Sequence, residues 1–443
     1  MKKIFTLALS LAVGTSLFAD SLQIFKCSED GIPGMTEPQL MGFSISANGR
    51  YICGAIEQGG GVFIADCETG EVKWKMADEA GGELRSVDNA GSSIGFLDDD
   101  GVVVSFETLG VDILQRPEGV RGILGESLSN DGRVKVGSFT EQSFNTVAAF
   151  SSDGSDWSAL PSPTDAELGN LKDHINKMST AKVVSGDGKV ILGHLGSFTF
   201  PIIWKINDAG EYLPDFFPAR YVKASDEDIA DDSKELYGLP AFYTAMSNNG
   251  KYVGGVGTIK EESGAFRIVP VIYNTEDKSI KLYKEYQDID YQGLGLYPRA
   301  IADDGTFIGT IGEPFTNSIG SFIMRAGEET AELFVDAFPA YAEMLGPSDI
   351  EGGMNVPTGI SADGSSIVGY TYYSENLDIY DDSPAYYLTY VIHTGLAGVD
   401  GVSSDMKSTP EAVYSIDGRS MKEMTKGINI VRKADGTVSK LLK

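Results

Sequence analysis

The 443-residue sequence is poor in the residues on which many enzymes depend. It has three histidines, His174, His194 and His393, and none of them has the spacing of a metal-ligand motif. It also lacks Gly-x-Ser-x-Gly, phosphate-loop and Cys-x-x-Cys motifs. These absences speak against the hydrolase, nucleotide-binding and redox sites that such motifs mark, so neither a cofactor nor a metal site is expected. A structural calcium ion on the Asp clusters stays open, although none of them has EF-hand spacing.

Basic residues and long apolar runs are scarce too. The chain has 35 Lys and Arg against 64 Asp and Glu, a formal net charge of −29. An excess of negative charge this large argues against nucleic acid and anionic membrane surfaces as partners, and it favours cationic partners or divalent cations. Beyond the first residues no apolar run is long enough to cross a bilayer, so we expect no transmembrane segment in the mature chain.

The N-terminus has the pattern of a secretory signal peptide. Met1-Lys2-Lys3 is basic, Ile4 to Val13 is apolar, and Leu17-Phe18-Ala19 offers a cleavage site before Asp20. We therefore predict a signal peptide over residues 1–19, with a short buried helix as the alternative. An exported chain meets an oxidising compartment, where one disulfide and one free thiol are compatible with the three cysteines, and the sequence leaves their pairing open: Cys27, Cys53 and Cys67.

What the sequence has in abundance is glycine, in a repeated turn. The clearest copy is Ser361-Ala-Asp-Gly364, which stands between two apolar stretches, with another glycine five residues later. Asp-Gly or Asn-Gly suits a two-residue hairpin loop because glycine takes positive φ without a Cβ clash. A glycine in the second strand leaves room for a neighbouring backbone or a bulky side chain. The turn occurs seven times, at Gly49, Gly91, Gly132, Gly188, Gly250, Gly305 and Gly364.

The spacing of these turns indicates the fold. Successive turn glycines are 42, 41, 56, 62, 55 and 59 residues apart, and apolar stretches such as Gly61–Asp66 and Glu71–Trp74 supply further strands. Four strands in such a period are typical of a β-propeller blade. We predict an all-β protein with a seven-bladed β-propeller over residues 20–396. The repeats resemble extracellular propeller repeats of the HAF type and, more loosely, WD40-like and YVTN-like blades, a resemblance that implies architecture and is nearly silent about ligand.

The seventh repeat lacks a fourth strand. Residues 21–26, near the N-terminus, alternate polar and apolar residues as a strand with one buried face does. An open blade would expose unpaired backbone groups. We therefore predict that residues 21–26 pair with residues 385–393 and close the ring.

Residues 397–443 form a predicted small β tail, with a linker from Ser403 to Pro410. Between residues 411 and 443 seven basic residues outnumber four acidic ones. Tyr414-Ser-Ile-Asp417-Gly418-Arg419 and Lys426-Gly427-Ile-Asn-Ile430-Val resemble the C-terminal sorting domain of type IX secretion cargo in Gram-negative bacteria. The resemblance implies secretion machinery as a partner and a secreted or outer-surface location. A β-rich appendage without that role is the alternative.

Long insertions fall between the predicted blades and within the last one. They are expected on the face opposite the hairpin turns, where loops on a rigid scaffold usually bind, and 165–178 and 337–345 are predicted to be partly helical. Aromatic residues stand beside carboxylates there, a composition that suits sugar stacking or a protein interface, with inward-packed aromatics as the plainer alternative. The candidate ligand-binding residues are Phe216, Phe217, Tyr221, Tyr237, Tyr291, Tyr372, Tyr373 and Tyr380.

These features predict a secreted or cell-surface binding protein whose ligand is a glycan or a protein. The alternative is a carbohydrate-active hydrolase or lyase that uses carboxylates on the same face, although no catalytic residue can be named and an enzyme is the less favoured class. A purely structural surface protein is a third possibility. Carboxylates in a deep central pocket would favour the enzyme, and an aromatic patch would favour binding.

Overall fold

A computed structural model describes most of the propeller and part of the tail. The described residues are 20–26, 39–56, 60–152, 156–168, 178–196, 200–216, 245–260, 266–283, 295–312, 318–341, 354–374, 385–394, 402–403, 412–414, 420–421, 428–432 and 438–442. Chain contacts separate a unit spanning Leu22–His393 from a second unit that includes Thr394–Lys443.

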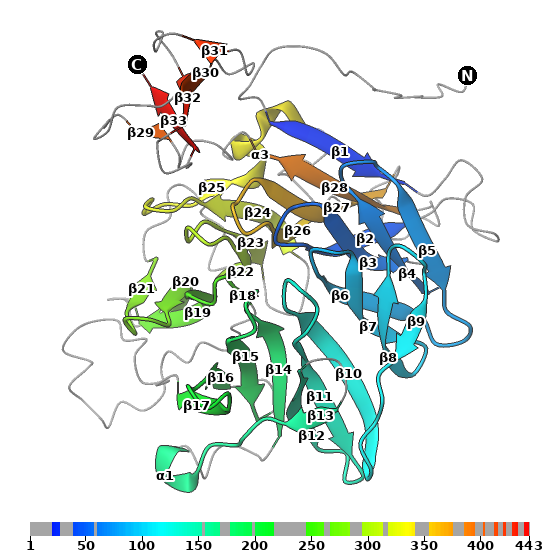
Figure 1. The fold of residues 1–443 in the computed structure, drawn as a ribbon. Coiled ribbons are helices and arrows are strands. Elements are labelled where there is room, and N and C mark those ends of the chain that lie inside the picture. The colour runs from blue at the N-terminus through cyan, green and yellow to red at the C-terminus, as the bar shows by residue number, and fades with distance from the viewer. Residues whose placement is uncertain are drawn as a thin grey trace. The chain divides into compact units, whose positions relative to one another are not determined.

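The first unit is a seven-bladed β-propeller, as the sequence predicts. It contains seven four-stranded antiparallel sheets arranged around a centre (Figure 1). In each blade the first strand is innermost and the following strands pair in order outward. The first strands are β2 (Leu40–Ile45), β6 (Gly82–Val87), β10 (Val120–Leu128), β14 (Ser179–Val184), β18 (Ala245–Met246), β22 (Gly295–Ile301) and β26 (Met354–Ile360).

The outer strands follow the same order around the ring. The second strands are β3 (Tyr51–Ile56), β7 (Ser92–Leu97), β11 (Lys135–Glu141), β15 (Val190–Leu195), β19 (Tyr252–Lys260), β23 (Phe307–Gly312) and β27 (Ser366–Ser374). The third strands are β4 (Gly61–Asp66), β8 (Asp100–Ser105), β12 (Thr146–Ser151), β16 (Phe200–Ile206), β20 (Phe266–Asn274), β24 (Ser318–Met324) and β28 (Ala385–His393). The fourth strands are β5 (Val72–Met76), β9 (Val111–Ile113), β13 (Trp157–Ala159), β17 (Tyr212–Phe216), β21 (Ile280–Leu282), β25 (Glu332–Leu333) and, in blade seven, β1 (Ser21–Phe25).

The predicted closure of the ring is confirmed. Strand β1 is the outer neighbour of β28, so the seventh blade combines one strand from the N-terminal end with three from the other end of the unit. Phe25 is buried, at 2% exposure, in a cluster that joins blades seven and one. The alternation over residues 21–26 also predicts that Ile24 is buried, and this part of the prediction is wrong, because 37% of Ile24 is exposed. An outermost strand is covered on fewer sides than an inner one, so its alternation is less strict.

The repeated turns are longer than the predicted two-residue loops. All seven turn glycines have φ between 70° and 95°, as expected. In blade three the N–H of Gly132 donates to the carbonyl oxygen of Ser129, and Ser129 Oγ accepts the N–H of Val134 at 3.0 Å. Ser129 Oγ also donates to Asp131 Oδ1, which accepts the N–H of Arg133. The Ser and Asp of the motif therefore act as hydrogen-bonding groups for the loop backbone.

The hydrophobic cores lie between adjacent blades, where apolar side chains of the strands of one sheet meet those of the next. Large fully buried side chains such as Phe63, Trp204 and Phe322 belong to third strands. Cys53 and Cys67 are free thiols in such positions, and burial raises the pKa of each to about 12. They are not joined to each other, and Cys27 lies outside the described residues.

The insertions carry little helix in the described ranges. Helix α1 (Asp165–Leu168) starts the first predicted helical segment, of which residues 169–177 lie outside the description. Helix α3 (Phe334–Ala337) and the 3₁₀ helix η3 (Pro339–Tyr341) begin before the segment predicted at 337–345, because Phe334 and Phe338 bury their rings in the core next to blade seven. No helix within the described ranges is both long and apolar enough to cross a membrane.

The tail is a separate small β unit. Its five-stranded sheet has the order β29 (Val402–Ser403), β33 (Val438–Leu442), β32 (Ile428–Arg432), β30 (Ala412–Tyr414) and β31 (Ser420–Met421). The tail ends in a hairpin, the antiparallel pair β32–β33. Strand β29 includes Ser403, so the sheet takes in the start of the predicted linker.

Candidate functional site

The inner strands share an irregularity that decides what faces the centre of the propeller. In six of the seven first strands a residue is skipped at the same place in the pairing with the second strand, for example between Leu84 and Ser86 or between Pro298 and Ala300. Such a β-bulge leaves an extra residue unpaired and redirects its side chain. The skipped residues occupy equivalent positions, six before the turn glycine, and we call them the bulge ring: Phe43, Arg85, Glu126, Lys182, Arg299 and Thr358.

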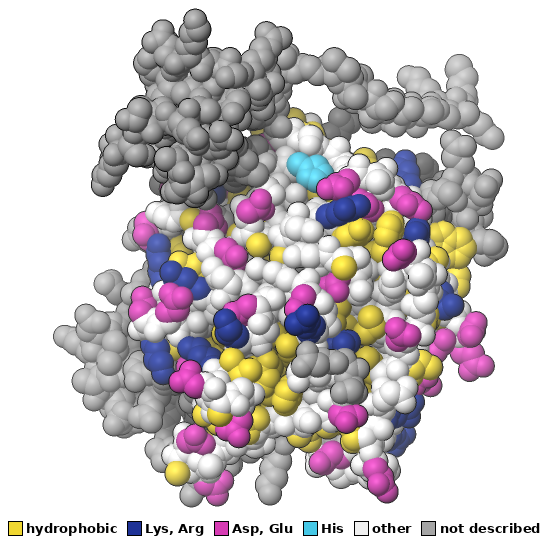
Figure 2. All heavy atoms as spheres, in the orientation of Figure 1, with side chains coloured by type: hydrophobic (Ala, Val, Ile, Leu, Met, Phe, Trp, Pro, Cys, Tyr) yellow, Lys and Arg dark blue, Asp and Glu magenta, His cyan; other side chains and the backbone are white. Residues whose placement is uncertain are grey.

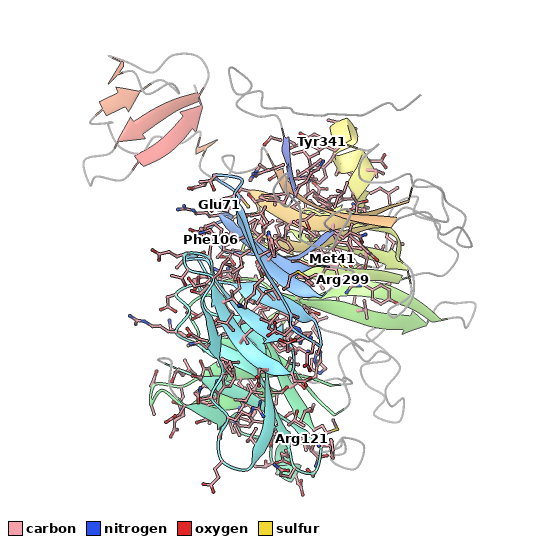
Figure 3. The ribbon with its side chains drawn as sticks, turned by 90° about the vertical axis from the view of Figure 1, so that its right-hand side faces the viewer. Met41, Glu71, Phe106, Arg121, Arg299 and Tyr341 are labelled. Atoms are coloured by element: carbon pink, nitrogen blue, oxygen red, sulfur yellow. The ribbon has the colours of Figure 1, made fainter. Side chains whose placement is uncertain are left out.

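The bulge ring lines a cavity at the centre of the propeller. The cavity has a volume of about 390 Å³, and first strands from all seven blades line it, with every member of the bulge ring among the lining residues. Pockets that hold small molecules have volumes of roughly 300–1,000 Å³. In Figure 3, where the ring is seen from the side, Arg299 lies in its middle, whereas Arg121 lies near its edge.

The hairpin turns form a hydrogen-bonded ring around one end of this cavity. The second residue of each turn motif meets its neighbours around the axis, and we call this set the turn ring: residues 47, 89, 130, 186, 248, 303 and 362. Five of the seven junctions are backbone hydrogen bonds, such as Asn130 N–H to Gly186 O at 3.0 Å. The other two use side chains, as in Asn249 N–H to Asp303 Oδ1 at 2.7 Å. A Cβ added at Gly186 would lie 2.3 Å from the amide groups of Asn130 and Asn248, so these two side chains would have to move.

The opposite end of the cavity, its mouth, lies where the first strands begin. The long connections between blades leave from that side, because each runs from a fourth strand to the next first strand. The face of the insertions and the mouth of the cavity are thus on the same side of the propeller.

One half of the bulge ring is an internal ion network. Glu126 Oε1 accepts a hydrogen bond from Arg85 Nη1 at 2.7 Å and from Lys182 Nζ at 2.6 Å. The Glu126 side chain is only 5% exposed, and Arg85 also pairs with Glu83. Burial works to lower the pKa of Arg85, but the charges of Glu126 and Glu83 outweigh it and the pKa is raised. The network ties blades two, three and four together.

Arg299 stands apart from this network. Its Nε–H donates to Thr310 Oγ1 at 3.2 Å, and it forms no ion pair with any carboxylate of the described ranges. Its side chain is exposed to water, yet protein surrounds it because it projects into the cavity, and the resulting desolvation lowers its pKa. A guanidinium remains protonated in proteins even so. Arg299 thus places an uncompensated positive charge in the cavity.

The charge of the cavity is opposite to that of the chain. Three cations and one carboxylate line it, whereas the whole sequence carries −29. On the face drawn in Figure 2, acidic and basic side chains are scattered among one another. Because a concave, cationic site concentrates field lines, it attracts anions even on an acidic protein.

Most residues predicted from the sequence to bind ligand cannot be placed. Phe217, Tyr221, Tyr237, Tyr291 and Tyr380 lie outside the described residues. Phe216, Tyr372 and Tyr373 lie in strands, but their side chains fall outside the description. The same holds for the tail: Tyr414 and Ile430 lie in strands, and Asp417, Gly418, Lys426 and Gly427 are not described.

The bulge ring was missed in the sequence analysis, although a signal exists. Counting back six residues from each turn glycine gives Phe43, Arg85, Glu126, Lys182, Thr244, Arg299 and Thr358. Charged residues at one fixed place in a strand buried at the centre of a propeller point to a functional lining. A search for strict period-two alternation misses these positions, since a bulge interrupts the alternation of the strand. Within the described part of the chain, no group of three or more metal-binding side chains comes together.

Comparison with known proteins gives distant structural likenesses and no family. No protein-family model matches the sequence, and no curated protein matches it either. Among solved structures, the chain is similar to an oligogalacturonate lyase from Vibrio parahaemolyticus, with 11% identity and a TM-score of 0.49 over 85% of this chain and 98% of that one. It is also similar to the Cps50 (Swd1) β-propeller domain of Myceliophteria thermophila, with 12% identity and a TM-score of 0.44 over 76% and 96%.

A third similar structure is TolB from Acinetobacter baumannii, at 11% identity and a TM-score of 0.38, with 64% of this chain covered. The match spans 63% of the TolB chain. At such identities and TM-scores the likeness does not extend to activity or ligand.

Proposed function

We propose that the protein is an exported binding protein that takes an anionic ligand into the central cavity of its propeller. The bulge ring is the observation that supports this proposal. Three cations face a cavity with one carboxylate, and that carboxylate, Glu126, is already bonded to Arg85 and Lys182. The site therefore has positive charge to offer to a ligand.

The insertions supply the outer part of the proposed site. Phe217, Tyr221 and Tyr372 belong to or border connections that leave from the side of the cavity mouth. We propose that these aromatics, with the other predicted ones, contact the part of a glycan or protein ligand that stays outside the cavity.

The geometry supports binding better than hydrolysis. Glycoside hydrolysis uses two carboxylates on either side of the scissile bond. Glu126 is the sole carboxylate among the described lining residues, and its Oε1 is already bonded to Arg85 and Lys182. Export rests on the predicted signal peptide over residues 1–19 and on the tail, which we propose is recognised by a type IX secretion system.

The test is a binding screen of the mature chain, residues 20–443, on glycan and protein arrays. Two variants of similar bulk are compared with the wild type: Ser44→Trp fills the cavity, and Ser158→Trp adds the same side chain on the exposed outer strand β13. We expect acidic ligands, retained by Ser158→Trp and lost with Ser44→Trp. Ligands that both variants retain equally would place binding outside the cavity and refute the proposal.

A further inference from the structure

The bulge ring has two unlike halves. Arg85, Glu126 and Lys182 satisfy one another, as described above. The other half consists of Arg299, Thr358 and Phe43, from blades six, seven and one. These blades are adjacent in the closed ring, since β26 contacts both β22 and β2. A cation, a hydroxyl and an aromatic ring therefore follow one another along one wall of the cavity.

Arg299 has the geometry to hold a carboxylate. A guanidinium has five N–H donors in a planar fork that matches the two oxygens of a carboxylate. One donor is used by Thr310 Oγ1, and no carboxylate of the described ranges takes the others. The charge is thus available to a ligand that brings its own carboxylate.

Phe43 offers a flat apolar surface near this charge. Its ring packs edge-to-face on Tyr370, with centroids 6.1 Å apart, which fixes its orientation. Tyr370 also acts on Arg299: desolvation lowers the pKa of the guanidinium, and the charge of Tyr370 works in the opposite direction. Aromatic faces stack on the C–H face of a sugar ring, and an aromatic ring held by a neighbour loses little freedom when it does so.

Hydroxyl groups complete the lining. Ser86 Oγ accepts the N–H of Leu128, and Ser127 Oγ accepts the N–H of Val184. Each of these hydroxyls keeps its own hydrogen for a further acceptor. Thr358 Oγ1 donates to Gly42 O at 2.7 Å and keeps lone pairs for a donor. The cavity lining can therefore both donate hydrogen bonds to ligand hydroxyls and accept hydrogen bonds from them.

We propose that the central cavity binds a sugar ring that carries a carboxylate, with Arg299 on the carboxylate, Phe43 against the ring face and the serine and threonine hydroxyls on the sugar hydroxyls. The proposal rests on the proposed function and specifies its ligand class. The turn ring surrounds the inner end of a cavity of about 390 Å³, a volume that suits one sugar or the end of a chain. A simple aliphatic or peptide carboxylate would use Arg299 but leave Phe43 and the hydroxyls without a role.

Calorimetric titration of the mature chain with three small probes tests this assignment. Methyl β-D-glucopyranosiduronate has both features, methyl β-D-glucopyranoside has the ring without the carboxylate, and N-acetylglycine has the carboxylate without the ring. We expect the glucuronide to bind at least about tenfold more tightly than either control, as expected for loss of one charge-assisted pair. Arg299→Gln should weaken glucuronide binding by about 10- to 100-fold. Arg133→Gln removes the same charge from an exposed turn and should leave binding unchanged.

The outcomes separate this inference from the proposed function. Equal, Arg299-dependent binding of N-acetylglycine and the glucuronide would show an anion site without sugar recognition, and it would overturn the inference alone. If none of the three probes binds, but Ser44→Trp still abolishes binding of the array ligands, the inference alone is again overturned. Array ligands that are insensitive to Ser44→Trp would instead overturn the proposed function. If Arg299→Gln changes the thermal midpoint, Arg299→Lys serves in its place, since it keeps the charge and removes the planar fork.

Discussion

Gly137 on β11 faces the carbonyl oxygen of Leu124 so closely that an added Cβ would lie 1.9 Å from that oxygen. The bulge at Glu126, two residues after Leu124, accounts for this approach, because it pushes the strand toward its neighbour. Equivalent glycines in other blades face equivalent carbonyls, for example Gly95 and Glu83 O at 1.9 Å. The repeated glycine of the second strand is thus required by the bulge in the first strand, because only a residue without a Cβ fits against the displaced carbonyl group.

The first prediction is that Gly137→Ala destabilises the propeller and disturbs the bulge. Crowding of this kind costs about 1–3 kcal/mol. The matched control is Gly122→Ala in the facing strand β10, where a Cβ meets no atom within 4 Å, so its effect should stay within about 0.5 kcal/mol. Urea unfolding measures both free energies. Equal stability of the two variants would show that the bulge relaxes freely.

Much of the fold could be predicted from the sequence because glycine marks places that other residues cannot occupy. Turn glycines such as Gly364 need positive φ, and they gave the number of blades and their order. The role of the neighbouring residues was less visible: Asp131 Oδ1 accepts the backbone N–H of Arg133 and the hydroxyl of Ser129, which no alternation pattern reveals.

The site was harder to predict than the fold. Arg299 and Glu126 are more than 170 residues apart in the sequence, and only closure of the ring brings them to one cavity. Their side chains face the centre because of bulges, whose positions depend on how two strands pair. The aromatic residues of the insertions are easier to pick out, since aromatics beside carboxylates are visible in the composition alone. Recognising the bulge ring requires the pairing register of two strands.

A second prediction concerns ring closure. Removal of residues 20–28 takes away β1 and leaves β28 as an unpaired edge. Loss of the buried Phe25 ring alone should cost about 1.5–3 kcal/mol, and the lost strand pairing adds to it. We expect a lower thermal midpoint for the whole propeller together with a tendency to associate through the open edge. An unchanged midpoint and a monomeric elution profile would contradict this.

The third prediction concerns export. Deletion of residues 411–443 removes strands of the separate tail sheet and leaves the propeller unit Leu22–His393 intact. We expect the truncated chain to have a normal thermal midpoint but to accumulate in the periplasm, because the proposed sorting signal is gone. Cell fractionation with an antibody to the propeller measures this. Surface delivery of the truncated chain at the wild-type level would remove the type IX hypothesis.

The last prediction uses His393, which lies at the closing blade. Its Nδ1 is 3.0 Å from Ser366 Oγ, and its Nε2 is 3.4 Å from Gln23 Oε1 on β1. Burial lowers the pKa of this imidazole below its usual value, which is near 6.5. The unfolded chain therefore takes up a proton at a higher pH than the folded one.

The sign of the effect follows from that difference. Above about pH 6.5 the imidazole is neutral in both states and does not affect stability, and as the pH falls through the folded-state pKa the free energy of unfolding decreases. His393→Gln keeps a hydrogen-bonding side chain but cannot titrate, so it should remove this part of the acid sensitivity. Urea midpoints measured between pH 8 and pH 5 for both proteins give the comparison. Parallel curves over that range would mean that His393 takes up its proton without cost and that the closing contact tolerates the charge.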